Sequence, residues 1–454
     1  MKRTAFQLLV ISSVALLLTA SQARTRPRYG DTLRADTKTV VMSGDTTPDA
    51  LVGTVFETLV TVDDSGNLQP GLATNWISTN NGSRWEFTLR SGVNFHDGQP
   101  CTPAAIQRAF ARLGNIPWHI RATADGLIFE SDTPQPNLSA LLSLPRYAIS
   151  ATTAEGDTVG TGPFRTDKRT GPIVSLKAND DYWSGRPFVD NLEITTSRTP
   201  RDQMTDFTLD RADLIEITPD QWRRAQQDHL RTFASRPAEL VAIVVTSSKP
   251  ELRDTRLRQA ISLAIDRAAI HNVIFQRQGE VAASLLPNWL TGYAFLFDIN
   301  PDVTKARQLR MEVGQVPALA IGYDAANPTE RLIAERVALN AHDIGVNMQA
   351  VPNTTPGIDL RIRSVALPSL DPATALNGLI DELALMPATS SPTPESLYAN
   401  ERAALQTYSA IPLVFLPRTT ALKDRIRNWT ASPNGEWHFE NVWLVPHSRA
   451  EVRP

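Results

Sequence analysis

The stretch Trp85-Glu-Phe-Thr-Leu-Arg-Ser-Gly-Val-Asn-Phe-His-Asp-Gly98 shows how this chain is built. Apolar and polar residues alternate over positions 84–90, and this period of two predicts a β-strand with one buried and one exposed face. Two turns follow the strand, one ending at Gly92 and the other at Gly98. The stretch therefore predicts a strand of a sheet, bounded by turns, rather than a helix.

Further strands are predicted on both sides of this stretch. Residues 240–245 are apolar throughout, as in a strand that is covered on both faces. The other strand candidates are Ile173–Ala178, Leu192–Thr196, Leu240–Thr246, Leu360–Val365 and Ile411–Leu416.

Helical spacing of apolar residues appears between these strands. After Pro250 the pattern predicts a helix, Asp266 is placed to cap a second one, and a third is predicted over residues 329–342, closed by Gly345. Cys101 precedes Thr102-Pro103, a typical helix start, and nothing beside it indicates a lowered pKa. The residues expected on the apolar faces of the three helices are Leu257, Ala260, Ile261, Ala264 and Ile265; Ile270, Val273 and Ile274; and Leu332, Ile333, Val337 and Ala341. Interleaved helices and strands predict an α/β architecture with mixed sheets.

The N-terminus has the features of a secretory signal peptide. Lys2 and Arg3 supply positive charge and residues 6–18 supply an apolar run of roughly 20 Å, too short for a membrane span of about 30 Å. Small residues at positions 21 and 23 predict cleavage after residue 23, so that residues 1–23 are removed. The single cysteine lies far from this site, so we expect no lipid anchor and a periplasmic location.

Composition limits the classes of partner and activity. The mature chain has 43 basic and 48 acidic residues, a net charge near −5 that argues against nucleic acid as a partner. The chain has no G-x-S-x-G, H-E-x-x-H or Walker-type motif, so we do not expect an enzyme. Its seven histidines show no metal-site spacing, so neither a metal nor a cofactor is expected.

Four blocks of sequence, in order, resemble the family 5 extracellular solute-binding proteins, the peptide and nickel type. They are Leu68-Gln-Pro-Gly-Leu-Ala-Thr-Asn-Trp76 with the stretch quoted first; Gly160-Thr-Gly-Pro-Phe164 with Asn179-Asp-Asp-Tyr-Trp183 and Gly185-Arg-Pro187; Leu252-Arg-Asp-Thr-Arg-Leu-Arg-Gln-Ala-Ile-Ser-Leu-Ala-Ile-Asp-Arg267; and Ile411-Pro-Leu413. Because they extend over most of the chain, they are more specific than any one motif.

The resemblance implies a two-lobed periplasmic-binding-protein fold in which the second lobe is inserted in the first. Mapped onto this chain, lobe I comprises residues 24–238 and 413–454, and lobe II comprises residues 239–412. It also implies a monomeric binding component of an ABC importer, which closes on an oligopeptide-like or other small organic solute and delivers it to permease subunits in the inner membrane.

One departure from the family pattern affects the expected ligand. In peptide-binding members an aspartate four residues before the proline of an Asp-Pro pair receives the amino terminus of the peptide. Here the pair is Asp371-Pro372 and the earlier position holds Pro368, which cannot bind an ammonium group.

Most candidate ligand-binding residues follow from the family resemblance, and Trp437 follows from a local aromatic cluster. Arg361 and Arg363 lie on a predicted strand before this loop and are candidates for an anionic ligand, with solvated arginines as the alternative. Trp289 and Tyr293 match a loop near the cleft of relatives, although a packed lobe II loop explains them equally well. Asp371, and Trp437 beside His438 in a C-terminal aromatic cluster, complete the set, and core packing also explains that cluster.

Two alternative functions stay open at this point. The proline at position 368 and a short following segment are compatible with a degenerate family member that acts as a sensor or interaction protein without import. Nickel or haem capture occurs among the relatives, but it has little support here without a histidine cluster.

Overall fold

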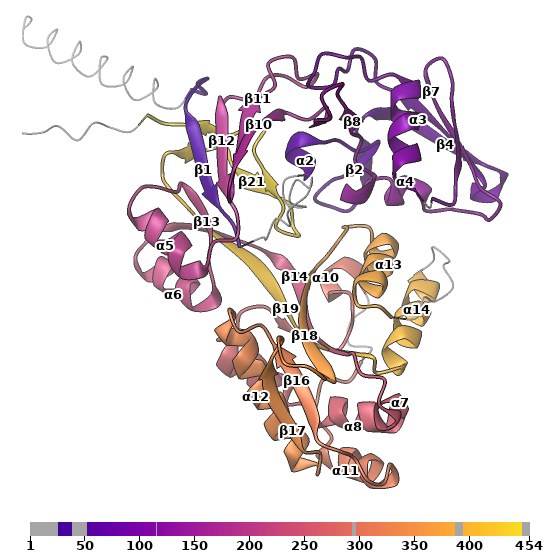
Figure 1. Ribbon diagram of the computed structural model, residues 1–454, viewed down its shortest axis with the longest axis vertical. Coiled ribbons are helices and arrows are strands. Elements are labelled where there is room, and N and C mark those ends of the chain that lie inside the picture. The colour runs from indigo at the N-terminus through magenta and orange to yellow at the C-terminus, as the bar shows by residue number, and fades with distance from the viewer. Residues whose placement is uncertain (1–25, 39–51, 115, 293–296, 386–393, 447–454) are drawn as a thin grey trace, which may run out of the picture.

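The computed structural model describes residues 26–38, 52–114, 116–292, 297–385 and 394–446, which form two lobes stacked along the long axis of the molecule (Figure 1). One 11-stranded sheet runs through both lobes in the order β10-β11-β12-β1-β13-β19-β14-β18-β16-β17, with β15 paired to β19. Its strands are β1 (Thr32–Asp36), β10 (Phe164–Thr170), β11 (Ile173–Ala178), β12 (Asn191–Thr195), β13 (Leu214–Glu216), β14 (Arg231–Val245), β15 (Glu280–Val281), β16 (Leu319–Tyr323), β17 (Met348–Pro352), β18 (Leu360–Ala366) and β19 (Ala410–Leu422). The mixed α/β, two-lobed fold predicted from the sequence is confirmed.

Two long antiparallel strands, β14 and β19, connect the lobes (Figure 1). Leu240 and Ala242 of β14 lie in one apolar cluster and Val241 and Ile243 in another, so this strand is covered on both faces as its apolar run predicts. The strand also begins earlier than predicted, at Arg231, because pairing with β19 holds its polar first half extended. The predicted lobe boundaries fall inside these two strands, and the residues at which the lobes divide stay a prediction.

Lobe I contains five strands of the large sheet and a separate four-stranded sheet, β4-β5-β7-β6. In β5, Trp85 and Phe87 are buried and pack in one apolar cluster, which confirms the alternation read from the sequence. The helix start at Thr102 is also confirmed, because its Oγ1 accepts a hydrogen bond from the Ala105 N–H at 3.2 Å. The lobe also contains β2 (Val60–Val62), β3 (Leu68–Pro70), β4 (Ala73–Thr79), β5 (Arg84–Leu89), β6 (His119–Ala122), β7 (Gly126–Glu130), β8 (Ala151–Thr152), β9 (Thr158–Val159), β20 (Ile426–Arg427), β21 (Thr430–Ala431), β22 (Trp437–His438), β23 (Trp443–Leu444), α2 (Val52–Val55), α3 (Pro103–Arg112), α4 (Leu138–Leu141), α5 (Pro200–Thr208) and α6 (Pro219–Gln227).

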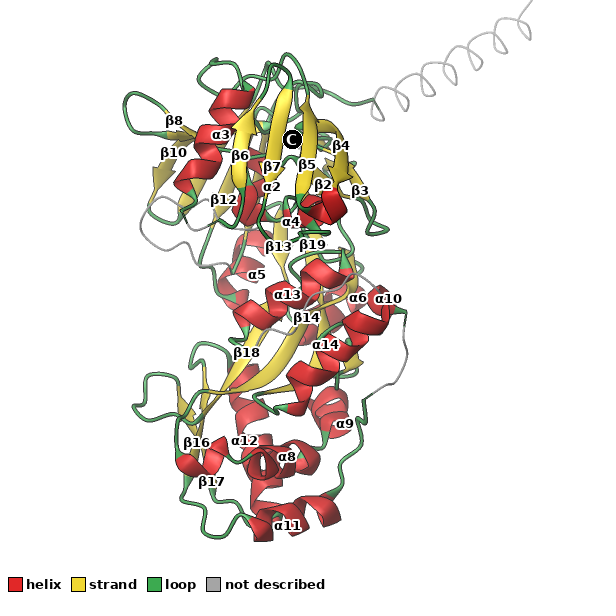
Figure 2. Ribbon diagram, turned by 90° about the vertical axis from the view of Figure 1, so that its right-hand side faces the viewer, coloured by secondary structure: helices red, strands yellow, loops and turns green. Residues whose placement is uncertain are grey.

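Lobe II packs helices on both faces of its part of the sheet (Figure 2). Helices α8, α11 and α12 bury their apolar residues with one face, and α13 and α14 with the other. No helix within the described ranges is long and apolar enough to cross a membrane. The helices of this lobe are α7 (Pro250–Arg253), α8 (Thr255–Ala264), α9 (Arg267–Ala269), α10 (Asn288–Thr291), α11 (Val303–Glu312), α12 (Pro328–Asp343), α13 (Pro372–Glu382) and α14 (Pro394–Gln406).

Two residues expected on the apolar faces of these helices are in fact exposed. Leu332 on α12 is 51 % exposed, because the core face of that helix follows the spacing of Ile333 and Val337, and Leu332 lies about 100° away from Ile333. Val273 is 74 % exposed, because residues 270–274 form a wider π-helical turn that changes which side chains face inward. The predicted signal peptide lies outside the described residues.

Candidate functional site: a cavity between the lobes

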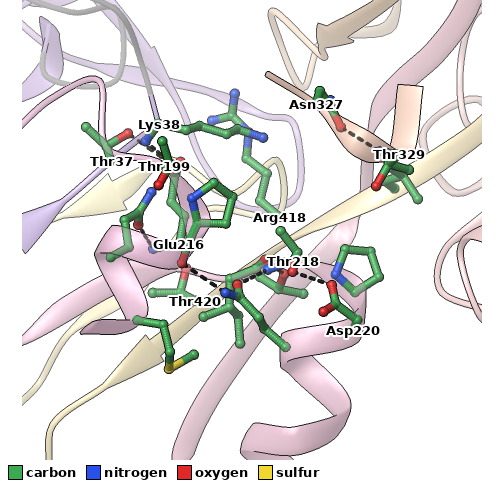
Figure 3. A pocket seen from close by; sticks show the side chains of 18 of the residues that line it. Thr37, Lys38, Thr199, Glu216, Thr218, Asp220, Asn327, Thr329, Arg418 and Thr420 are labelled. Atoms are coloured by element: carbon green, nitrogen blue, oxygen red, sulfur yellow. Dashed lines mark hydrogen bonds between the residues drawn. The ribbon is translucent and has the colours of Figure 1, made fainter. Parts of the chain in front are cut away.

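A cavity of about 1240 Å³ lies between the two lobes (Figure 3). The strands β12, β1 and β13 run parallel in lobe I, and β16 and β18 run parallel in lobe II. Parallel strands present their carboxyl ends at one edge, where the ligands of α/β proteins bind. The cavity wall contains residues at or just after these ends from both lobes, namely Lys38, Ser197, Arg198, Glu216 and Asp324.

The crossover strands form part of the same wall. Glu239 and Val241 of β14 and Pro417 and Arg418 of β19 line the cavity. A movement of one lobe relative to the other therefore changes the shape of this space directly.

The lobes also touch at the margins of the cavity and beyond it. The Gln278 side-chain amide of lobe II donates a hydrogen bond to the carbonyl of Pro219 in lobe I at 3.0 Å. Elsewhere, Arg146 of lobe I lies 3.8 Å from the Asp381 carboxylate on α13. The two halves are thus in direct contact on more than one side.

Three helices begin on the cavity wall, and each start is encoded locally. Thr199, Thr218 and Asn327 are the N-cap residues of α5, α6 and α12, and a proline occupies the first turn of each helix. All three caps line the cavity. The caps satisfy backbone donors of their own helices and thereby fix these corners of the wall.

Glu216, at the end of β13, holds the segment that follows β1 (Figure 3). Its Oε2 accepts a hydrogen bond from the Lys38 N–H at 2.6 Å and another from the Thr37 hydroxyl at 3.1 Å. Its own N–H donates to Gln203 on α5 at 2.9 Å. The position of Lys38 is therefore set by backbone bonding, independently of its side chain.

The side chain of Lys38 forms an ion pair with the crossover strand. Its Nζ lies 3.5 Å from Glu239 Oε2, and the Glu239 side chain is only 14 % exposed. The carboxylate raises the pKa of Lys38, and Lys38 in turn holds the pKa of Glu239 below its usual range. Both groups are therefore charged at neutral pH.

Glu436 and Trp437 come to the cavity from the C-terminal return. Burial raises the pKa of Glu436, an effect that the nearby His438 and Arg418 partly oppose. Trp437 packs edge-on against Phe439, with ring centroids 6.1 Å apart, and contributes an aromatic surface.

The residues predicted from the sequence are dispersed around this cavity. Trp437 lines it, and Tyr293 lies outside the described residues. Trp289 instead donates a hydrogen bond to the Pro237 carbonyl at 2.8 Å and packs against a lobe II core. Asp371 caps α13 by accepting from the Thr374 N–H at 2.9 Å.

The two arginines predicted on β18 also have partners away from the cavity. Arg361 donates to Asn353 at 3.2 Å, and Arg363 pairs with Glu382 at 3.0 Å on the surface. Neither is among the residues that line the cavity. Their contact with a ligand stays a prediction.

Sequence reasoning missed the charged residues of the cavity. Glu239 stands directly before the apolar segment 240–245, Arg418 stands two positions after the segment 411–416, and Lys38 stands two positions after the last residue of β1. A charge at the end of a buried strand was the available signal. No local motif marks these residues, because their partners are distant in the sequence.

Comparison with known proteins identifies the family. Residues 67–357 match the family described as "Bacterial extracellular solute-binding proteins, family 5 Middle". The matched residues make up more than half of the chain. The chain belongs to this family. The resemblance drawn from the four sequence blocks is therefore confirmed.

One relative of this chain is named as a transport protein. The chain is 25 % identical over 369 residues to the "Probable ABC transporter periplasmic-binding protein SapA" of Escherichia coli, covering 67 % of this chain and 65 % of that one. The chain thus spans about two thirds of the length of this relative.

Solved structures share the two-lobed fold. DppA of Helicobacter pylori, in complex with the peptide STSA, superposes on this chain with a TM-score of 0.78 at 16 % identity. The superposition covers 94 % of this family 5 chain and 100 % of the DppA chain. NikA of Staphylococcus aureus, in complex with Ni(L-His)2, superposes with a TM-score of 0.78 at 15 % identity, covering 91 % and 100 %. At these identities the likeness concerns the fold alone.

The described part of the chain contains no group of three or more histidine, cysteine or acidic side chains arranged to hold a metal ion. The isolated cysteine, Cys101, is buried, and burial raises its pKa to about 12, with Glu57 contributing in the same direction. Cys101 is not among the residues that line the cavity.

Proposed function

We propose that this protein is the periplasmic, monomeric binding component of an ABC importer and that it captures a small peptide-like organic solute in the cavity between its lobes. The observation that carries the proposal is the cavity of about 1240 Å³, whose wall is shared by both lobes and by the strands that join them. The space is large enough for a drug-sized or oligopeptide-like solute. Membership of the solute-binding family and the ABC-transporter relative support the same role.

Closure follows from the position of the cavity. A solute that contacts both walls binds the closed arrangement better than an open one, and the population shifts toward closure by that difference in affinity. The permease subunits then recognise the closed form. No chemical step is needed, so we propose no enzymatic activity.

Binding and closure can be tested on the chain that begins at Arg24. We expect one class among a panel of dipeptides, tripeptides, amino acids and organic acids to bind with micromolar affinity or better by calorimetry. When its free concentration is one hundred times the dissociation constant, such a solute raises the free energy of unfolding by about 2.7 kcal/mol. A thermal-shift assay detects a change of this size. Small-angle scattering should show a smaller radius of gyration with the solute than without it.

Absence of any binding across the panel would count against the import function and favour the sensor or interaction role. No specific observation favours nickel or haem capture, so we do not propose either ligand.

A further inference from the structure

Two of the cationic side chains that line the cavity converge from different elements. Lys38 follows β1 in lobe I, and Arg418 belongs to the crossover strand β19. Figure 3 shows the two side chains extending into the cavity toward each other. The positive charge of Arg418 also opposes protonation of Lys38, as expected of neighbouring cations.

Arg418 is held in place without using its guanidinium group. Its backbone N–H donates to Ser235 Oγ at 2.9 Å. Its aliphatic stem lies over Gly435, where a Cβ atom would come within 2.7 Å of two side-chain carbons of Arg418. Among the described residues, no hydrogen bond or ion pair engages the guanidinium. The backbone and stem thus position a charged head that is free to bind.

Three acidic groups of the same wall act on these two cations, and two of the three are already engaged. Glu216 accepts from the Lys38 N–H and the Thr37 hydroxyl, and Glu239 pairs with the Lys38 side chain. Glu436 forms no ion pair among the described residues, and burial opposes its ionisation. Glu239 forms the ion pair with Lys38, whereas Arg418 attracts Glu239 and Glu436 without a direct ion pair, so the N–H donors of its guanidinium remain for an incoming anion.

We propose that Lys38 and Arg418 form a subsite that holds a carboxylate of the bound solute, with Arg418 as the main specificity-determining residue and Glu239 fixing Lys38. Arginine suits this role because its planar fork of N–H donors matches the two oxygens of a carboxylate. The inference rests on the proposed function, since it assigns the chemistry of one end of the solute in the same cavity.

The main experiment compares solutes that differ only in this group. Dipeptides with a free carboxyl terminus and the same dipeptides as carboxyl-terminal amides are titrated into the chain from Arg24 by calorimetry. A charge-assisted contact predicts that each amide binds about ten- to one-hundred-fold more weakly than its acid. Arg418→Gln should weaken binding of the acids by a similar factor and leave the amides unchanged, and Lys38→Gln should act in the same direction.

The control is Arg331→Gln, which removes the same charge from an exposed pair with Glu335 on α12 outside the cavity. This variant should bind acids and amides as the unaltered protein does. Melting curves of all variants show that loss of binding does not reflect loss of folding.

A second measurement does not depend on the peptide panel. Crystals of the ligand-free protein are soaked in selenate, and the selenium is located from its anomalous scattering. A peak between Lys38 and Arg418 supports the subsite, and its absence in Arg418→Gln crystals strengthens the assignment.

The outcomes separate the two proposals. Peptide binding with equal affinity for acids and amides, or binding unaffected by Arg418→Gln, overturns the subsite and leaves the solute-binding function standing. A selenate peak without any solute binding supports the subsite and counts against the function. If neither a peak nor binding is found, both proposals are wrong.

Discussion

Arg267 offers the sharpest test of how lobe II is joined to the crossover strands. Its side chain is buried, and its Nε donates to the Pro412 carbonyl on β19 at 2.8 Å. Its other two nitrogens donate to the carbonyl and the hydroxyl of Ser262 on α8, at 3.2 and 3.1 Å. Burial lowers the pKa of Arg267 to about 10, and the guanidinium therefore stays charged at neutral pH.

Replacing Arg267 with alanine should destabilise the protein markedly. Hydrogen bonds to a charged group each contribute about 1.5–3 kcal/mol, and the cost of burying the charge offsets part of their sum. The alanine variant also leaves two buried carbonyls without this donor. We therefore expect a loss of about 3 to 5 kcal/mol in the free energy of unfolding, and about 2 kcal/mol for Arg267→Met, which fills more of the space.

Urea unfolding followed by circular dichroism measures these losses, and hydrogen exchange within α8 shows whether lobe II alone is affected. The control is Arg331→Ala, whose exposed pair with Glu335 predicts a change below about 0.5 kcal/mol. A methionine variant as stable as the unaltered protein would refute the reasoning, because hydrophobic volume would then replace the hydrogen bonds without loss.

Two further predictions concern Gly279 and Cys101. Gly279 has φ +79°, and a Cβ atom there would lie 2.0 Å from the Phe415 carbonyl oxygen of β19, so Gly279→Ala should cost at least about 2 kcal/mol in urea unfolding. Gly345 has φ +78° with nothing within 4 Å, so Gly345→Ala should cost only about 1 kcal/mol, and equal losses would show that the close approach is unimportant. Cys101 is buried and its pKa is raised to about 12, so iodoacetamide at mildly alkaline pH should label it only after unfolding, as mass spectrometry can measure, and rapid labelling of the folded protein would contradict its burial.

Much of the fold could be predicted because its signals are local. The strand predicted over residues 173–178 is β11, and Asp266 caps the following helix by accepting from the Ala269 N–H at 2.9 Å. Leu332 was assigned wrongly because several apolar residues on α12 fit helical spacing, and only packing decides which face is buried. Local periodicity therefore specifies elements better than it specifies the buried face of a helix with apolar residues on two sides.

The cavity could not be predicted in the same way, because its wall is assembled from distant positions. Thr37 and Glu216, whose hydrogen bond orders the segment that carries Lys38, are separated by 179 positions. The family resemblance led instead to residues of lobe II, and several of these have structural partners. Pairing of this kind depends on the sheet order, in which β1 lies beside β13, and no motif encodes it.

The crossover strands bring the fold and the cavity together at one point. Pro237 of β14 faces Pro417 of β19, and the pairing register shifts on both sides of Pro237. Neither proline has an N–H to donate, so the ladder between the lobes lacks both backbone donors at this pair. Hinge closure requires a few residues that absorb a change in backbone angle. Glu239 follows Pro237 by two positions and Arg418 directly follows Pro417, so both charged side chains lie next to this pair. We infer that the lobes bend at this proline pair, so that a solute held by Arg418 acts directly beside the hinge.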